Sequence, residues 1–116
     1  MTAIMSDYTP GTEDVYIKVG ANIKVSKRDV PNVVNIVTRM GKKLETISYT
    51  RMHIELYEFE NMNVRITSNL SGQPAEVEIY VPFSQSRLAD LGTNERDVEI
   101  QEIIREAYSR AGGTAE

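Results

Sequence analysis

The chain has 116 residues, no cysteine and a formal net charge of −4 at pH 7. This length suits one domain with its own core, and the lack of cysteine excludes disulfides, thiolate metal sites and thiol catalysis. A chain without cysteine also fits a cytoplasmic location. No apolar run approaches the roughly 20 residues that cross a bilayer, so we expect no membrane contact.

The charge is unevenly distributed along the chain. Residues 18–51 carry eight basic and two acidic side chains, whereas the residues from 52 onward carry five basic and twelve acidic ones. A polyanion can bind one region of a protein whose net charge is negative, so this distribution permits a nucleic-acid partner. The alternative is that the basic run is the solvated face of a helix.

The first elements follow from composition and periodicity. Residues 1–14 contain no sustained apolar stretch and read as a flexible leader rather than a signal peptide. Between residues 15 and 25 every odd position is apolar, which predicts a strand. We expect this strand to bend at Gly20 and lead directly into a helix.

The apolar period changes to 3.6 residues over positions 26–44, which predicts an amphipathic helix. Pro31 is tolerated only in a first turn, so Asp29 is favoured as the N-cap. The apolar face is expected to contain Val30, Val33, Val34, Val37, Met40, Gly41 and Leu44. The opposite face is expected to contain Arg28, Asn32, Asn35, Arg39, Lys42 and Lys43.

Three further strands are expected at residues 49–59, 64–67 and 76–81, separated by turn-forming clusters. In the first of them we expect Ile54 and Leu56 to face the core and His53 and Tyr57 to face away. Each strand is apolar on one face only, which indicates a sheet that helices cover on one side.

A last helix is expected to have Thr93 as its N-cap and to end at Gly112-Gly113. The order β-α-β-β-β-α predicts an α+β, two-layer domain over residues 15–112, with a four-stranded sheet covered on one face by two helices. Residues 113–116 are expected to form a disordered tail. The buried stripe of the last helix should contain Ile100, Ile103, Ile104, Ala107, Tyr108 and Ala111.

Several short motifs occur in a recognisable order. Gly20, Asn22, Val25 and Ser26 join the first strand to the basic helix, and a segment beginning at Asp97 opens the last helix. Between them lie the strands at 64–67 and 76–79, joined by a turn that contains glycine. In this order, over about residues 15–110, the motifs resemble the ribosome hibernation-promoting factors, also called ribosome-associated translation inhibitors.

The resemblance implies a non-enzymatic, cytoplasmic RNA-binding protein of the stress response. Such a protein would regulate translation by occupying the mRNA/tRNA channel of the small ribosomal subunit and contacting its rRNA. Basic and amide side chains suit phosphate, ribose and base edges. The expected RNA-binding residues are Lys24, Lys27, Arg28, Asn32, Asn35, Arg39, Lys42 and Lys43.

The alternative function is protein interaction or inhibition, including self-association as a homodimer. It would use the acidic last helix or the open side of the sheet, where Tyr16, His53, Tyr57 and Tyr80 are expected. A single histidine without cysteine argues against zinc. We expect no catalytic site, cofactor, metal or small-molecule substrate, because no nucleophile set or glycine-rich phosphate loop is present.

Overall fold

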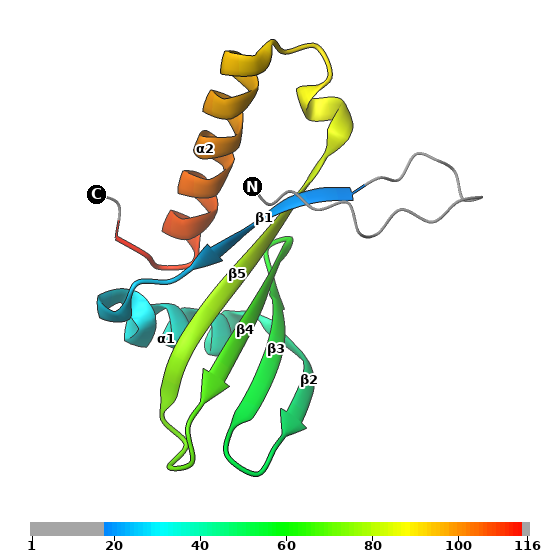
Figure 1. The fold of residues 1–116 in the computed structure, drawn as a ribbon. Helices are drawn as coiled ribbons and strands as arrows, with labels where there is room; N and C mark the ends of the chain where they lie inside the picture. The colour runs from blue at the N-terminus through cyan, green and yellow to red at the C-terminus, as the bar shows by residue number, and fades with distance from the viewer. Residues whose placement is uncertain (1–17, 115–116) are drawn as a thin grey trace, which may run out of the picture.

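The computed structural model describes residues 18–114, apart from the side chains of residues 18, 19 and 84–86. The expected leader and Tyr16 lie outside the described residues. The α+β class is confirmed, with two helices and one antiparallel sheet (Figure 1). In chain order the elements are β1 (Lys18–Lys24), a 3-10 turn (Lys27–Asp29), α1 (Val30–Met40), β2 (Lys42–Ser48), β3 (His53–Phe59), β4 (Met62–Ser68), β5 (Pro74–Ser84), a second 3-10 turn (Gln85–Leu88) and α2 (Thr93–Arg110).

The sheet has five strands in the order β1-β5-β4-β3-β2, not the four that the sequence predicted. All neighbouring strands are antiparallel, and β1 and β2 form the two edges. The β2–β3 and β4–β5 turns lie at one end of the molecule, and the start of α2 lies at the other (Figure 1). The additional strand is β2, whose first three residues were expected to belong to the first helix.

Gly41 explains why α1 ends before the predicted boundary. A Cβ atom at this position would lie 2.7 Å from the carbonyl oxygen of Val37 and 3.0 Å from that of Glu58. Only glycine lets the chain leave the helix so close to β3, and the next residue begins β2. Met40 and Leu44 were therefore wrongly assigned to the buried helix face, since they are 70% and 51% exposed.

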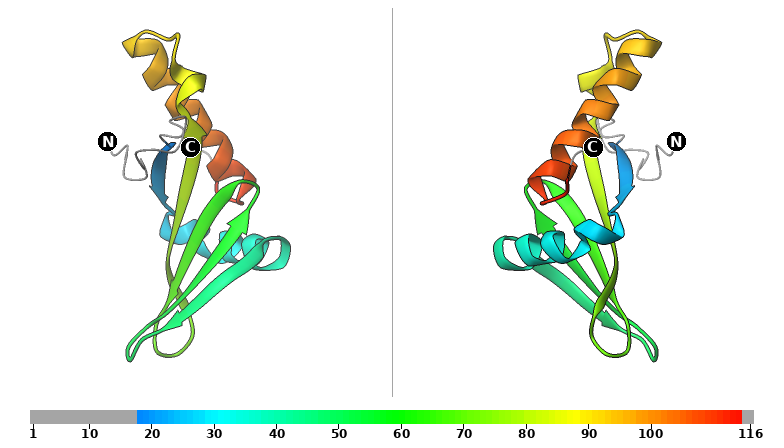
Figure 2. Two further views of the ribbon diagram at one scale, coloured as in Figure 1. Left: turned by 90° about the vertical axis from the view of Figure 1, so that its right-hand side faces the viewer. Right: turned by 90° about the vertical axis from the view of Figure 1, so that its left-hand side faces the viewer.

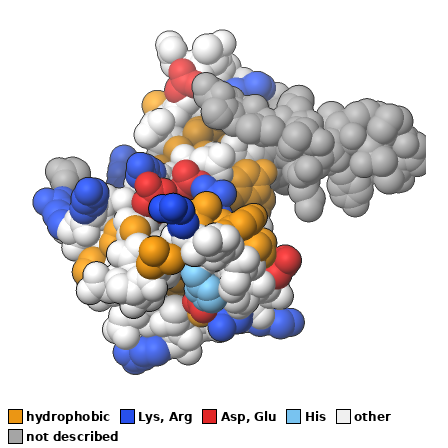
Figure 3. Space-filling view, turned by 60° about the horizontal axis from the view of Figure 1, so that its bottom comes forward, with side chains coloured by type: hydrophobic (Ala, Val, Ile, Leu, Met, Phe, Trp, Pro, Cys, Tyr) orange, Lys and Arg blue, Asp and Glu red, His pale blue; other side chains and the backbone are white. Residues whose placement is uncertain are grey.

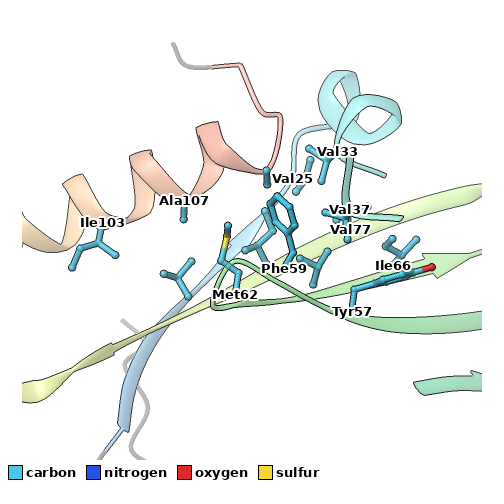
Figure 4. Packing of buried hydrophobic residues seen from close by; sticks show 14 of the residues in the cluster. Val25, Val33, Val37, Tyr57, Phe59, Met62, Ile66, Val77, Ile103 and Ala107 are labelled. Carbon is cyan, nitrogen blue, oxygen red and sulfur yellow. The ribbon is translucent and has the colours of Figure 1, made fainter. Parts of the chain in front are cut away.

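The core lies between one face of the sheet and both helices (Figure 4). Alternate residues of β4 and β5 point into it, as the period of two predicts. The expected stripe of α2 is buried at its centre and half-buried around it. The helices contribute Val30, Val33 and Val37 from α1, and Ile103 and Ala107 from α2, with Ala111 just beyond it.

The faces of β3 are the reverse of those predicted. Tyr57 and Phe59 are buried, and they pair with the buried residues Val64 and Met62 of β4. Both sets of alternating positions in β3 contain large apolar side chains, so periodicity alone could not decide which set faces the helices. The pairing with β4 decides it, because a shift by one residue exchanges the faces. Ile54 and Leu56 consequently lie on the open face.

The first half of α2 extends beyond the sheet, beside the second 3-10 turn that follows β5 (Figure 2). The N-cap lies one residue earlier than predicted, at Gly92, whose N–H donates to Glu95 Oε1 at 2.9 Å, and Thr93 is the first helical residue. An ion pair of 2.7 Å between Arg87 and Glu99 joins the second 3-10 turn to α2. None of the described helices is long and apolar enough to span a bilayer.

Candidate functional site

The expected RNA-binding residues divide among three places. The first is the cationic flank, defined as Lys27, Arg28, Asn35 and Arg39, whose side chains are exposed along α1 and the turn before it. Neither Lys27 nor Arg39 forms an ion pair within the part of the chain that the structure describes. These two cations are therefore available to an anionic partner.

The side-chain amide of Asn32, also on α1, forms a hydrogen bond within the protein. Its Nδ2 donates to the carbonyl oxygen of Gly112 at 2.8 Å. A Cβ atom at Gly112 would lie 2.7 Å from Ile36 Cδ1, and this glycine has a φ of +105°. Asn32 thus holds the chain after α2 against α1, where the close approach requires glycine.

The three remaining lysines lie on the sheet. Lys24 pairs with Glu78 across β1 and β5, and Lys42 pairs with Glu58 across β2 and β3. These positions face the open side of the sheet. Lys43 points to the opposite side, where its Nζ lies 3.4 Å from Glu55 Oε2. The helix that would have aligned Lys42 and Lys43 with Arg39 does not extend that far.

The surface view is consistent with this division. On the face drawn in Figure 3, Lys and Arg side chains occupy several separate groups, with hydrophobic side chains and the histidine between them. The structure therefore gathers half of the predicted set on the cationic flank and distributes the other half. The predicted helix face is therefore split, because Lys42 and Lys43 lie on β2 and not on α1.

A cluster of polar side chains outside the predicted RNA-binding set joins the two helices through Asp29. This residue is 4% exposed. Its carboxylate accepts hydrogen bonds from Tyr108 Oη at 2.6 Å and from Thr114 Oγ1 at 2.7 Å. The Thr114 N–H and the Ser26 hydroxyl also donate to it, at 3.2 and 3.1 Å. The bonds from Tyr108, Thr114 and Ser26 lower the pKa of Asp29 well below its usual value, although burial opposes them. This arrangement stabilises an ionised carboxylate.

We call Asp29, Ser26, Tyr108 and Thr114 the carboxylate clamp. Asp29 does cap the start of α1 by position, but its side chain bonds to α2 and the chain after it rather than to the helix N-terminus. Thr114 lies in the segment that we expected to be a disordered tail. The clamp ties the start of α1 to the end of α2 and to the chain that follows it.

Another polar cluster contains His53, the single histidine of the sequence, and lies on the helix side of the sheet. Ser48 Oγ lies 3.2 Å from His53 Nδ1, and His53 Nε2 lies 3.5 Å from Glu55 Oε2. The Tyr57 hydroxyl donates to Glu55 Oε1 at 3.1 Å. His53 and Tyr57 are thus not on the open face, contrary to the prediction.

The contacts within this cluster shift the pKa values of Glu55 and Tyr57. Burial raises the pKa of Glu55, but the contacts with Tyr57, Lys43 and His53 outweigh it, and the net pKa is lowered. Burial and the neighbouring Glu55 raise the pKa of Tyr57. Glu55 already has three partners, and these residues are neighbours on β2 and β3. The cluster is therefore accounted for by strand pairing.

The described residues contain no group of three histidine, cysteine, aspartate or glutamate side chains that could hold a metal ion. In the carboxylate clamp and in the histidine cluster, each polar side chain has at least one of the hydrogen-bond or ion-pair partners given above.

The open face of the sheet carries an apolar patch that was not predicted from the sequence. We define the open-face patch as Leu44, Ile47, Ile54 and Leu56, from β2 and β3. Leu44 is 51% exposed, and the other three are half-buried. Ile54 lies directly opposite Ile47, and Leu56 lies opposite Glu45 next to the bulge at Leu44.

A shallow hollow adjoins this patch toward β1. Tyr80 lies across Gly20, where any Cβ atom would collide with its ring. Arg65 pairs with Glu78 beside it. The lining residues are Asn22, Leu44, Leu56, Tyr57, Asn63, Val64, Arg65, Glu78 and Tyr80. The alternation of apolar residues on both sides of β3 was the one signal that could have indicated this face.

No family model, curated protein or solved structure matches the chain. The resemblance to ribosome hibernation-promoting factors therefore stays a prediction.

Proposed function

We propose that this protein is a non-enzymatic interaction module that binds a partner protein through the open face of its sheet. The observation that supports it is the open-face patch. Four aliphatic side chains lie together on a sheet face that neither helix covers. Contiguous apolar surface of this kind is typical of protein–protein contact sites.

The surroundings of the patch have the composition of an interface rim. Arg65 and Glu78 form an ion pair on one side, and Lys42 faces Glu58 on another. Polar residues around an apolar centre let a surface stay solvated when it is free and lose water at its centre when it is bound. Tyr80 adds an aromatic side chain, a type enriched at such contacts.

RNA binding of the ribosome-hibernation type is the second candidate. The exposed cationic flank favours it, because Lys27 and Arg39 lack ion-pair partners among the described residues. The amide of Asn35 lies between them along α1. The flank holds three cations, so we expect a log–log salt slope of magnitude below about 3 for RNA.

A capture experiment with the immobilised protein and a nuclease-treated native lysate separates the two candidates. Light scattering first establishes the oligomeric state of the protein itself. We expect a protein partner that Leu56→Arg loses and Val98→Arg retains. Val98 is the matched control, since it is an apolar side chain on α2 with 67% exposure, away from the sheet face. Binding that nuclease abolishes, or that Leu56→Arg leaves intact, contradicts the open-face proposal.

The RNA candidate has its own variant. Lys27→Glu combined with Arg39→Glu should abolish co-sedimentation with small ribosomal subunits at low salt and leave the melting temperature unchanged, because both side chains are exposed. Retained co-sedimentation removes the cationic flank as a binding site.

A further inference from the structure

β2 is an edge strand whose outer side has no strand neighbour among residues 18–114. An edge strand presents a row of backbone N–H and C=O groups that another extended chain can pair with. The other edge, β1, differs because its apolar residues Ala21 and Ile23 pack against the core. In β2 every side chain except Ile47 is exposed.

Exposed apolar side chains concentrate in the segment that contains β2 and its flanking residues. Six large hydrophobic side chains are exposed in the described part of the chain, and four of them lie between residues 40 and 52. Leu44 is within β2, Met40 ends α1 two residues before it, and Tyr49 and Met52 lie in the turn between β2 and β3. They are Met40 at 70%, Leu44 at 51%, Tyr49 at 55% and Met52 at 41% exposure.

The charge along the same segment is positive. Arg39, Lys42 and Arg51 are exposed and have no ion-pair partner within the described residues. Glu45 is the one acidic residue of β2. Lysines on an edge strand oppose its pairing with a second, identical strand, because like charges are brought together. The same lysines attract a strand of opposite charge.

We propose that the free edge of β2 binds an extended, acidic segment of a partner protein by strand addition. Backbone hydrogen bonds would supply affinity, and the basic and apolar side chains would select acidic sequences that also carry apolar residues. The exposed methionines and Leu44 favour a peptide over a nucleic acid, which offers no aliphatic side chains. This inference rests on the proposed function, since Leu44 and Ile47 belong to both surfaces.

The test uses the full chain, labelled with ¹⁵N, and a synthetic peptide in which valine and glutamate alternate. We expect saturable amide shifts confined to 42–48 and its flanks. The same peptide with lysine in place of glutamate should bind at least about tenfold more weakly, as expected when several weak ion pairs become repulsions. A peptide with alternate amides N-methylated should lose binding, because it cannot form the ladder.

The chain supplies a matched pair of variants. Lys42→Glu should weaken peptide binding several-fold, and Lys24→Glu should leave it unchanged. Both lysines are exposed, lie on edge strands and face a glutamate across the sheet. Fold is checked by the unchanged amide spectrum outside the substituted strand.

Four results would overturn the inference: absence of shifts in β2, equal binding of the basic peptide, protection of β2 by a concentration-dependent dimer, or oligonucleotide binding that Lys42→Glu abolishes. The proposed function is judged separately. A captured partner that is lost with Leu56→Arg but kept with Lys42→Glu supports the open face and rejects the edge. A partner that both variants still capture rejects the open-face proposal as well.

Discussion

The open-face patch depends on which side of β3 faces the helices, and two substitutions three residues apart test this directly. Phe59 is 5% exposed in the core, whereas Leu56 is half-buried on the open face. Phe59→Ala removes a buried ring and should lower the free energy of unfolding by about 4 kcal/mol. Leu56→Thr keeps a strand-forming residue at a partly exposed site and should cost less than about 1 kcal/mol.

The difference is large enough for ordinary denaturation experiments. A loss of about 4 kcal/mol corresponds to a decrease in melting temperature of about 20 °C for a domain of this size. Urea midpoints for the two variants and the parent protein give the free energies independently. If Leu56→Thr proves the more destabilising, then Ile54 and Leu56 face the core, and the open-face patch does not exist.

Two further predictions concern the ends of α1. The pKa of Asp29 is lowered in the folded protein from its ordinary 3.8, so its contribution to stability is complete above that value and is lost as pH falls toward the folded pKa. Urea midpoints between about pH 5 and pH 2 should fall more steeply for the parent than for Asp29→Asn, and equal slopes would show that the carboxylate clamp is not ionised. Gly41→Ala should destabilise by about 1–3 kcal/mol, because its Cβ meets backbone oxygen at 2.7 Å. A Gly41→Ala protein as stable as the parent would reject the steric explanation.

Periodicity located most elements because the buried and exposed residues of those elements separate clearly. The N-cap of α2 lies one residue before the predicted Thr93, and Val77, Ile79 and Val81 of β5 are buried as their alternation indicates. The apolar residues of α1 up to Val37 are buried or half-buried as well. In each of these segments one periodic pattern fits and the competing pattern does not.

β2 was missed because its sequence supports a helix locally. Lys42, Lys43 and Leu44 favour helices, and Leu44 continues the apolar spacing of α1. The strand forms through long-range pairing with β3 and through the close approach at Gly41. Neither contact can be read from a local window.

The candidate sites were predicted less well than the fold, since they depend on those same contacts. Ending α1 at Met40 separates Lys42 and Lys43 from Arg39 and places the two lysines on opposite sides of the sheet. The register of β3 then moves Tyr57 into the core. The carboxylate clamp joins positions about eighty residues apart, and no spacing rule connects Asp29 with Tyr108.

The central claim is that a partner protein covers the open face of the sheet. Hydroxyl-radical footprinting of the captured complex against the free protein measures this side chain by side chain. We predict that oxidation of Leu44, Leu56 and Tyr80 decreases in the complex, while residues 27–39 react as in the free protein. Protection of 27–39 with no change at Leu56 would contradict the account and indicate α1 as the binding surface.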